Sequence, residues 1–361
     1  MNRSPKNRIR LEDVAKEAGV SRCTAGQVLN GGRGNSRVSA ATAGRIRDIA
    51  ARLGYKPNFA AMTLRGDRSR TFGVLVASVG DPLRSFLVQY LDAEAVRLGR
   101  RVFFGNTIGN DRIGNDQFDN ILDLFTSLQV DGVFCALHRW IPGDRDKLLA
   151  LHPATVFYED YAVRGAPNVI VDRRRAVELS VDHLVSRGYK RIALAINSHH
   201  NSTGQKRVEG WKNGLEKWGL TPDSGCLLMP DPFYDQVFAT CLEHEFRWNF
   251  PFEAMDPVID QLVIQGKADA VIAQNDFWAA ALIKRMRARS IRVPDDVAVV
   301  GFLNHYLADW VDPGITTIDM NYIQVAQKML ELLESRVTEG EFILGTGPFY
   351  VEPKLVIRES T

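Results

Sequence analysis

Residues 11–30 read LEDVAKEAGVSRCTAGQVLN, and this stretch decides the architecture of the N-terminal part of the chain. Its apolar residues recur at helical intervals from Leu11 to Ala18, which predicts a helix with one buried face. Gly19 permits the sharp turn that follows. Ser21 is a good N-cap for a second helix, residues 22 to about 30. The stretch therefore predicts a helix-turn-helix.

The second of these helices leaves a polar face uncovered. Ala25, Val28 and Leu29 face inward, so the side chains on the opposite side can contact a partner. A recognition helix touches base edges in the major groove of DNA with its N-terminal half. We expect DNA contacts from the residues on and beside this face: Ser21, Arg22, Cys23, Gln27 and Asn30.

A third helix and a short segment follow. Ser39 caps a helix that Gly54 ends. Beyond a turn at Tyr55, Asn58 can cap one more helix of seven residues, 59–65. A helix of this length is not stable alone. It needs a partner, which is either the same segment of a second subunit or DNA.

The net charge of +2 hides an asymmetry along the chain. Residues 1–70 hold 15 Lys and Arg against 5 Asp and Glu, whereas the remainder holds 30 against 38. A basic N-terminal module on a mildly acidic body indicates a polyanion as the partner of that module alone.

From Thr71 onward, strand patterns alternate with helix patterns. Residues 71–78 read as a strand and residues 82–99 as a helix, and the alternation restarts at about residue 177. Such alternation predicts an α/β fold of parallel sheets flanked by helices, in two lobes. Ligands of such folds lie beyond the carboxyl ends of the strands, here between the lobes. The aromatic-rich stretch 231–256 has the character of a local insertion.

The ordered motifs of the chain resemble the LacI/GalR (lactose/galactose repressor) family. They are AKEAGVS, then VLN, VS and LGYKPN, and the resemblance continues nearly to the C-terminus. It implies a helix-turn-helix DNA-binding domain over 1–57, a hinge helix and linker over 58–70, and a two-lobed effector-binding and dimerisation domain over 71–361. The body resembles periplasmic sugar-binding proteins, in which the chain crosses between the lobes three times. Residues 316–333 then return to the first lobe and residues 350–360 to the second.

The resemblance also assigns roles in DNA binding. Leu64 matches a hinge leucine that wedges into the minor groove at the operator centre, and such wedges bend DNA. Lys56 is placed to touch phosphate, and Asn58 lies at the start of the hinge. Gln27 stands where the family commonly has Arg. Because Gln pairs with adenine and Arg with guanine, we expect an operator that differs from the family's usual one.

Candidate effector contacts lie near predicted strand ends. By resemblance, Arg207 in QKRVEGW matches an effector-binding Arg, and the Asn-Asp pair of AQND matches a pair that bonds ligand hydroxyls. Other readings stay open, since an Asp here can cap a helix, an Arg can be solvated and aromatics can be core. The full set that we expect to contact the effector is Arg207, Asn275, Asp276, Arg112, Phe233, Phe277, Asp81 and Asp172.

Two departures from the family bear on the effector. Gly301-Phe302 is followed by Leu303-Asn304, where the family has two Asp residues. Leu303 cannot accept hydrogen bonds from sugar hydroxyls, and residues 173–175 form a run of three arginines. A cleft that loses an acid and gains arginines favours a less hydroxylated or anionic effector. The alternative is that the arginine run is a solvated surface.

Other classes of function find little support in the sequence. The four cysteines are scattered, which argues against disulfides and zinc and fits a reducing cytoplasm. There is no membrane-span-length apolar run, no apolar leader, and no G-x-S-x-G, P-loop or metal-binding spacing. We expect no enzyme activity and no cofactor. The sequence predicts a cytoplasmic, homodimeric, effector-controlled transcription regulator, a repressor of carbohydrate-related genes. A soluble sugar-binding sensor without a regulatory role is the alternative.

Overall fold

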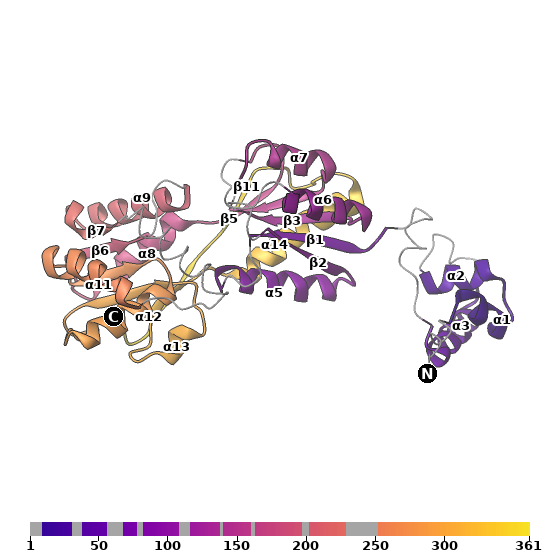
Figure 1. The fold of residues 1–361 in the computed structure, drawn as a ribbon, viewed down its shortest axis with the longest axis horizontal. Helices are drawn as coiled ribbons and strands as arrows, with labels where there is room; N and C mark the ends of the chain where they lie inside the picture. Colours follow the sequence, from indigo (N-terminus) through magenta and orange to yellow (C-terminus); the bar gives the residue numbers. More distant parts are fainter. Residues whose placement is uncertain are drawn as a thin grey trace.

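The computed structural model describes residues 9–30, 38–55, 68–77, 82–107, 116–137, 140–159, 163–196, 202–228 and 252–361. Figure 1 shows a small helical module at the N-terminal end of the chain and two sheet-based lobes next to each other. Within the described residues, no helix is long and apolar enough to cross a lipid bilayer.

The N-terminal module consists of α1 (Leu11–Ala18), α2 (Arg22–Asn30) and α3 (Ala40–Leu53). The predicted caps are confirmed. The hydroxyl of Ser21 accepts a hydrogen bond from the Thr24 amide at 3.0 Å, and Ser39 caps α3 in the same way. The three helices share one core, formed by Leu11, Val14, Ala15, Ala18, Ala25, Val28, Ala43, Ile46, Ile49 and Ala50.

The turns between these helices depend on glycine. Gly19 has φ 64° and Gly54 has φ 69°, a left-handed conformation that glycine adopts without strain. Each ends its helix by donating its backbone N–H to carbonyls of the last turn. The helix-turn-helix that the sequence predicts is therefore present, and its geometry is fixed locally.

The first lobe is built on a six-stranded sheet in which every strand pair is parallel. Its strands lie in the order β11 (Pro348–Val351), β5 (Asn168–Val171), β4 (Thr155–Tyr158), β3 (Gly132–Ala136), β1 (Thr71–Val76) and β2 (Arg101–Asn106). Its helices are α5 (Pro82–Arg97), α6 (Asp116–Ser127), α7 (Asp144–Leu151) and α14 (Tyr322–Glu339).

Alternating side chains cover the two faces of this sheet. In β1, Phe72 and Val74 belong to the core that includes α5 and α14, whereas Leu75 packs with Phe118 of α6. This alternation is the period of two that a strand imposes. Gly73 allows the ring of Phe125 to approach, since a Cβ there would lie 2.6 Å from it.

The second lobe repeats this plan. Its strands lie in the order β12 (Lys354–Val356), β10 (Thr316–Asp319), β9 (Ala298–Phe302), β8 (Ala270–Ala273), β6 (Ile192–Ala195) and β7 (Leu227–Leu228). All pairs are parallel except β10 with β12. Its helices include α8 (Arg173–Ser186), α9 (Ser202–Lys217), α11 (Asp256–Ile259), α12 (Asp276–Ala288) and α13 (Leu307–Trp310).

Helices α8 and α9 pack closely because α9 carries glycines at their contact. A Cβ on Gly210 would lie 2.3 Å from the backbone carbonyl oxygen of Arg174, and one on Gly214 would lie 2.9 Å from Val181. The two glycines are four residues apart and so lie on one face of the helix.

The chain passes between the lobes three times, as the resemblance implies. The crossings connect β5 to α8, β10 to α14, and β11 to β12 (Figure 1). At the first crossing, Arg173 donates from Nε and Nη2 to the two carboxylate oxygens of Glu159, both at 2.7 Å. Its Nη1 lies 3.4 Å from the sulfur of Met320, at the second crossing. A buried ion pair therefore connects the first crossing to the end of β4 in the first lobe.

Candidate DNA-binding surface and effector site

The polar face of α2 lies at the surface, as predicted. Arg22 is 64% exposed and pairs with Glu12 of α1 at 3.1 Å. Cys23 is an exposed free thiol, and Gln27 is half-buried beside the buried Ala25. An exposed ion pair of this kind contributes little to stability, so Arg22 can exchange Glu12 for a phosphate at small cost.

Several predicted DNA contacts lie outside the described residues. These are the side chain of Asn30, and Lys56, Asn58 and Leu64. Ser21 is described, and its hydroxyl already caps α2. Its position at the N-terminus of α2 places it beside backbone N–H groups that attract anions such as phosphate.

Arg207 lies where two strands of the second lobe end. It projects from α9, is 4% exposed, and donates from Nη1 to the carbonyl oxygen and the side-chain oxygen of Gln274, at 2.7 and 3.0 Å. Its guanidinium carbon is 4.5 Å from the ring centroid of Phe302. Gln274 follows β8 and Phe302 ends β9, so the guanidinium is held at the carboxyl edge of this sheet.

Asn275 and Asp276 begin α12 at the same edge. Asn275 caps the helix, because its Oδ1 accepts from the amide of Trp278 at 2.9 Å. Asp276 does not cap it. Its fully buried carboxylate accepts from the hydroxyl of Thr317 and from the amide of His305, at 2.5 and 2.7 Å. Burial raises the pKa of this carboxyl to about 7, against hydrogen bonds that lower it. This position favours a supporting role for Asp276 over direct contact with a ligand.

Aromatic rings from both lobes meet beside these residues. The ring centroid of Phe277 is 4.8 Å from that of His305, and the ring of Phe86, from α5 of the first lobe, is 5.1 Å from the same imidazole. Burial lowers the pKa of His305. Phe277, which the sequence predicts as a ligand contact, therefore packs on His305, the residue that contacts Phe86 of the first lobe.

The remaining predicted contacts are less closely gathered. Asp172 caps α8, since its Oδ1 accepts from the Arg175 amide at 2.9 Å, and it lies at the first crossing. Asp81, Arg112 and Phe233 follow β1, β2 and β7 in the sequence and lie outside the described residues. The structure thus brings together Arg207, Asn275, Asp276 and Phe277.

The structure describes Leu303 and Asn304, the two positions where the family has Asp residues. Leu303 is buried with φ 111°, a conformation that strains a residue with a Cβ. Asn304 accepts from Nη2 of Arg358 at 2.8 Å, and its amide nitrogen lies 3.4 Å from a carboxylate oxygen of Asp319. At these two positions the strand end presents an apolar side chain and an amide already engaged by charged neighbours.

The arginine run does not behave as one unit. Arg174 and Arg175 are partly exposed and pair with acidic residues on and near α8, as a solvated surface would. Arg173 is instead buried against Glu159. The sequence predicts neither this pair nor the positions of Gln274 and His305. An Arg two residues after a buried strand is the one signal that could have indicated a buried partner for Arg173.

Comparisons with known proteins agree with this architecture. Residues 10–58 match the family described as bacterial regulatory proteins, lacI family, and residues 181–361 match the periplasmic binding protein-like domain. The HTH-type transcriptional repressor CytR of Escherichia coli K12 is 26% identical over 97% of this chain and 96% of its own. The HTH-type transcriptional regulator DegA of Bacillus subtilis is 25% identical over 97% of each chain.

Solved structures show the same fold over nearly the whole chain. A lac repressor dimer bound to operator and the anti-inducer ONPF has a TM-score of 0.74 at 22% identity, and covers 98% of this chain and 99% of that one. A complex of the transcriptional regulator CelR with cellobiose has a TM-score of 0.67 at 24% identity, and covers 98% of this chain and 100% of that one.

Proposed function

The chain belongs to the LacI family of bacterial regulatory proteins, and we propose that it is a transcriptional repressor whose affinity for DNA is adjusted by a small molecule. One observation carries the proposal: a single chain joins exposed polar residues of α2 to a body in which Arg207, bonded to Gln274, and the adjacent Asn275 lie at the carboxyl edge of the second sheet. The first feature fits operator DNA, and the second fits an effector.

The DNA partner follows from shape and charge. The basic N-terminal region presents Arg22 and Gln27 on a helix of nine residues, which fits the major groove. Two such modules in a dimer would read two half-sites of a pseudo-palindrome. Asn30, Lys56 and Asn58 stay predicted contacts, and Leu64 stays the predicted wedge at the operator centre.

A second copy of the chain has apolar surfaces to cover. On the first lobe, Val96 and Leu98 at the end of α5 and Phe103 and Phe104 of β2 are between 42% and 62% exposed. On the second lobe, Trp310 of α13 is 75% exposed. Exposed large apolar groups of this kind typify protein interfaces, and a closed two-fold dimer would bury both sets.

The effector would act by fixing the angle between the lobes. A ligand on Arg207 and Asn275 of the second lobe, touching predicted first-lobe contacts such as Asp81 and Arg112, would favour one lobe arrangement. That arrangement would set the separation of the two DNA-binding modules, so the ligand shifts DNA affinity by its different affinity for the two states. Leu303 favours an effector with fewer hydroxyls than a sugar, and Arg207 suits an anionic group. Regulation of carbohydrate-related genes in the cytoplasm, without catalytic activity, completes the proposal.

The test begins with DNA. Selection from a randomised duplex pool should yield a pseudo-palindrome, and Gln27→Ala should relax base preference at one symmetric pair of positions, at roughly 1–3 kcal/mol per lost contact. Selection of the same sequences by Gln27→Ala would refute the assignment of Gln27, and selection of none by the parent would refute the function.

The effector is then found by a thermal-shift screen of sugars, sugar phosphates and sugar acids. A compound at 100 times its dissociation constant stabilises the chain by ~2.7 kcal/mol. Arg207→Ala should bind the selected duplex as the parent does, yet no longer respond to that compound. A parent-like response would remove Arg207 from the site.

A further inference from the structure

The carboxylate of Asp131 accepts from the last residues before β1, and the carbonyl of Arg70 also accepts from the amide of Arg101 at 2.9 Å. The side chain of Asp131, which precedes β3, is only 7% exposed. Its Oδ1 accepts from the amide and the hydroxyl of Ser69, both at 3.1 Å, and its Oδ2 accepts from the amide of Arg70 at 3.0 Å. These residues end the segment that leads from the DNA-binding module, so Asp131 fixes the point where that segment joins the body.

Asp131 is itself tied to α14. Nη1 of Arg100 donates to Asp131 at 2.7 Å, and Nε and Nη2 of the same guanidinium donate to the two carboxylate oxygens of Glu334 at 2.6 Å. Charge-assisted and bidentate hydrogen bonds of this kind are strong and directional. Because Glu334 lies 12 residues after Tyr322, where α14 begins, the helix spans about 18 Å from the second crossing to this point.

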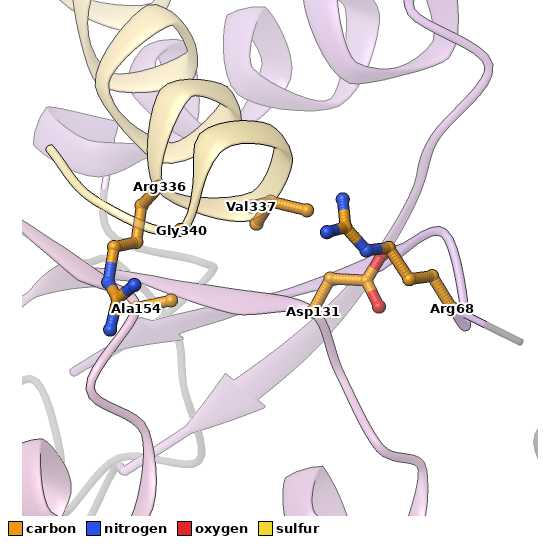
Figure 2. A pocket seen from close by; sticks show the side chains of 6 residues that line it. All are labelled: Arg68, Asp131, Ala154, Arg336, Val337 and Gly340. Carbon is orange, nitrogen blue, oxygen red and sulfur yellow. The ribbon is translucent and has the colours of Figure 1, made fainter. Parts of the chain in front are cut away.

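Figure 2 shows the same place from close by. A cavity of about 300 Å³ lies here, lined by Arg68, Asp131, Ala154, Arg336, Val337 and Gly340. Arg68 comes from the end of the linker, and Arg336, Val337 and Gly340 come from the C-terminal end of α14. The linker and the end of α14 therefore meet at one site.

The second lobe contains the same device in another context. Asp269 precedes β8, and its two carboxylate oxygens accept from the amides of Lys190 and Arg191, both at 2.9 Å. The backbone amide of Asp269 also donates to the carbonyl oxygen of Arg191. In the same way, the backbone amide of Asp131 donates to the carbonyl oxygen of Thr71. Asp269, however, holds only the turn between α8 and β6. It is therefore an internal control for Asp131.

We propose that Asp131 is a positioning residue for DNA binding, a role that rests on the proposed function of the chain. By fixing residues 69 and 70, it sets where each DNA-binding module leaves the body and in which direction. Two modules that leave from fixed points reach two half-sites with less loss of conformational freedom than modules on longer, looser segments. Arg100 and Glu334 hold Asp131 in turn, so a shift of α14 would move the residues of the linker that Asp131 holds.

The experiment compares the full-length parent with Asp131→Asn, Asp269→Asn and Glu334→Gln. The probe is the duplex that the parent selects from a randomised pool, and affinity is measured by fluorescence anisotropy at a temperature where urea titration shows every variant to be folded. Asp131→Asn should weaken binding about ten-fold, the order expected when roughly one residue's backbone must be re-ordered on DNA. Glu334→Gln should weaken it less, because Arg100 stays on Asp131. Asp269→Asn should bind as the parent does.

Trypsin cleavage after Arg68 and Arg70 gives a readout that does not need DNA. It should accelerate in Asp131→Asn and not in Asp269→Asn. The proposal is overturned if Asp131→Asn binds like the parent, if both aspartate variants lose affinity equally, or if linker cleavage is unchanged. Should Asp131→Asn fail to fold, parent-like affinity and cleavage in Glu334→Gln would overturn it. A parent that selects no duplex refutes the proposed function, while the cleavage comparison still decides whether Asp131 holds the linker.

Discussion

The two lobes share one plan but hold different things at their sheet edges. At the amino edge of the first sheet, Asp131 holds the segment that leads from the DNA-binding module. At the carboxyl edge of the second sheet, Arg207 and Asn275 gather at the ends of β8 and β9. The comparison teaches that two lobes of the same α/β plan can serve different functions when each lobe uses a different edge of its sheet. The crossings between the lobes then connect the two sites.

The largest effect is expected at the first crossing, where a buried ion pair joins the two lobes. Arg173→Met would leave the Glu159 carboxylate buried without its guanidinium, which destabilises a protein by about 3–5 kcal/mol. Urea unfolding of the full chain measures the change. Arg174→Met is the matched control, because Arg174 is the next residue and is 42% exposed; its free energy of unfolding should stay near that of the parent.

A second variant sharpens this test. The double change Glu159→Gln with Arg173→Met removes both charges, so it should be less destabilising than Arg173→Met alone. If Arg173→Met unfolds at the same urea concentration as Arg174→Met, the ion pair does not hold the crossing.

The next effect compares close packing in the two lobes. Gly210→Ala should destabilise the second lobe by about 1–3 kcal/mol, since its Cβ would meet the backbone of α8, which cannot move without shifting the helix. Gly73→Ala in the first lobe should have a smaller effect, since its Cβ meets a side-chain ring. Thermal unfolding decides. Gly44→Ala in α3 has nothing within 4 Å of its Cβ and should be neutral or stabilising by up to about 1 kcal/mol. Equal losses in Gly210→Ala and Gly73→Ala would contradict the distinction.

The smallest effect concerns pH and belongs to the second lobe alone. Because the pKa of Asp276 is raised from 3.8 to about 7 in the folded chain, the native state binds this proton more tightly than the unfolded state does. Its contribution to stability is complete below about pH 3.8 and is lost as the pH rises through 7. Asp276→Asn, which resembles the protonated acid, should therefore lose less stability than the parent between pH 5.5 and 7.5.

Urea midpoints at the two pH values measure this difference. His305, whose backbone amide donates to Asp276 and whose pKa burial lowers, is present in both proteins, so comparing the two slopes isolates Asp276. Parallel slopes would show that Asp276 stays ionised across this range.

The sequence by itself determined whatever depends on neighbours along the chain. Ser21 and Gly19 are found as a cap and a turn because each bonds to groups within four residues. The alternation of strands and helices, and the return of α14 to the first lobe, also follow from periodicity and resemblance. Arg207 and Asn275 were predicted by resemblance as effector contacts, and they stay predicted contacts; both lie at the carboxyl edge of the second sheet.

Only the tertiary structure decided which distant partners the charged residues meet. Arg173 is one of three adjacent arginines, and nothing local separates it from Arg174, yet one is buried against Glu159 and the other is solvated. Asp131 lies about 60 residues along the chain from Ser69 and Arg70, whose amides donate hydrogen bonds to it. Burial and pairing of a charge depend on which strands and helices pack together, and that arrangement is a property of the whole fold.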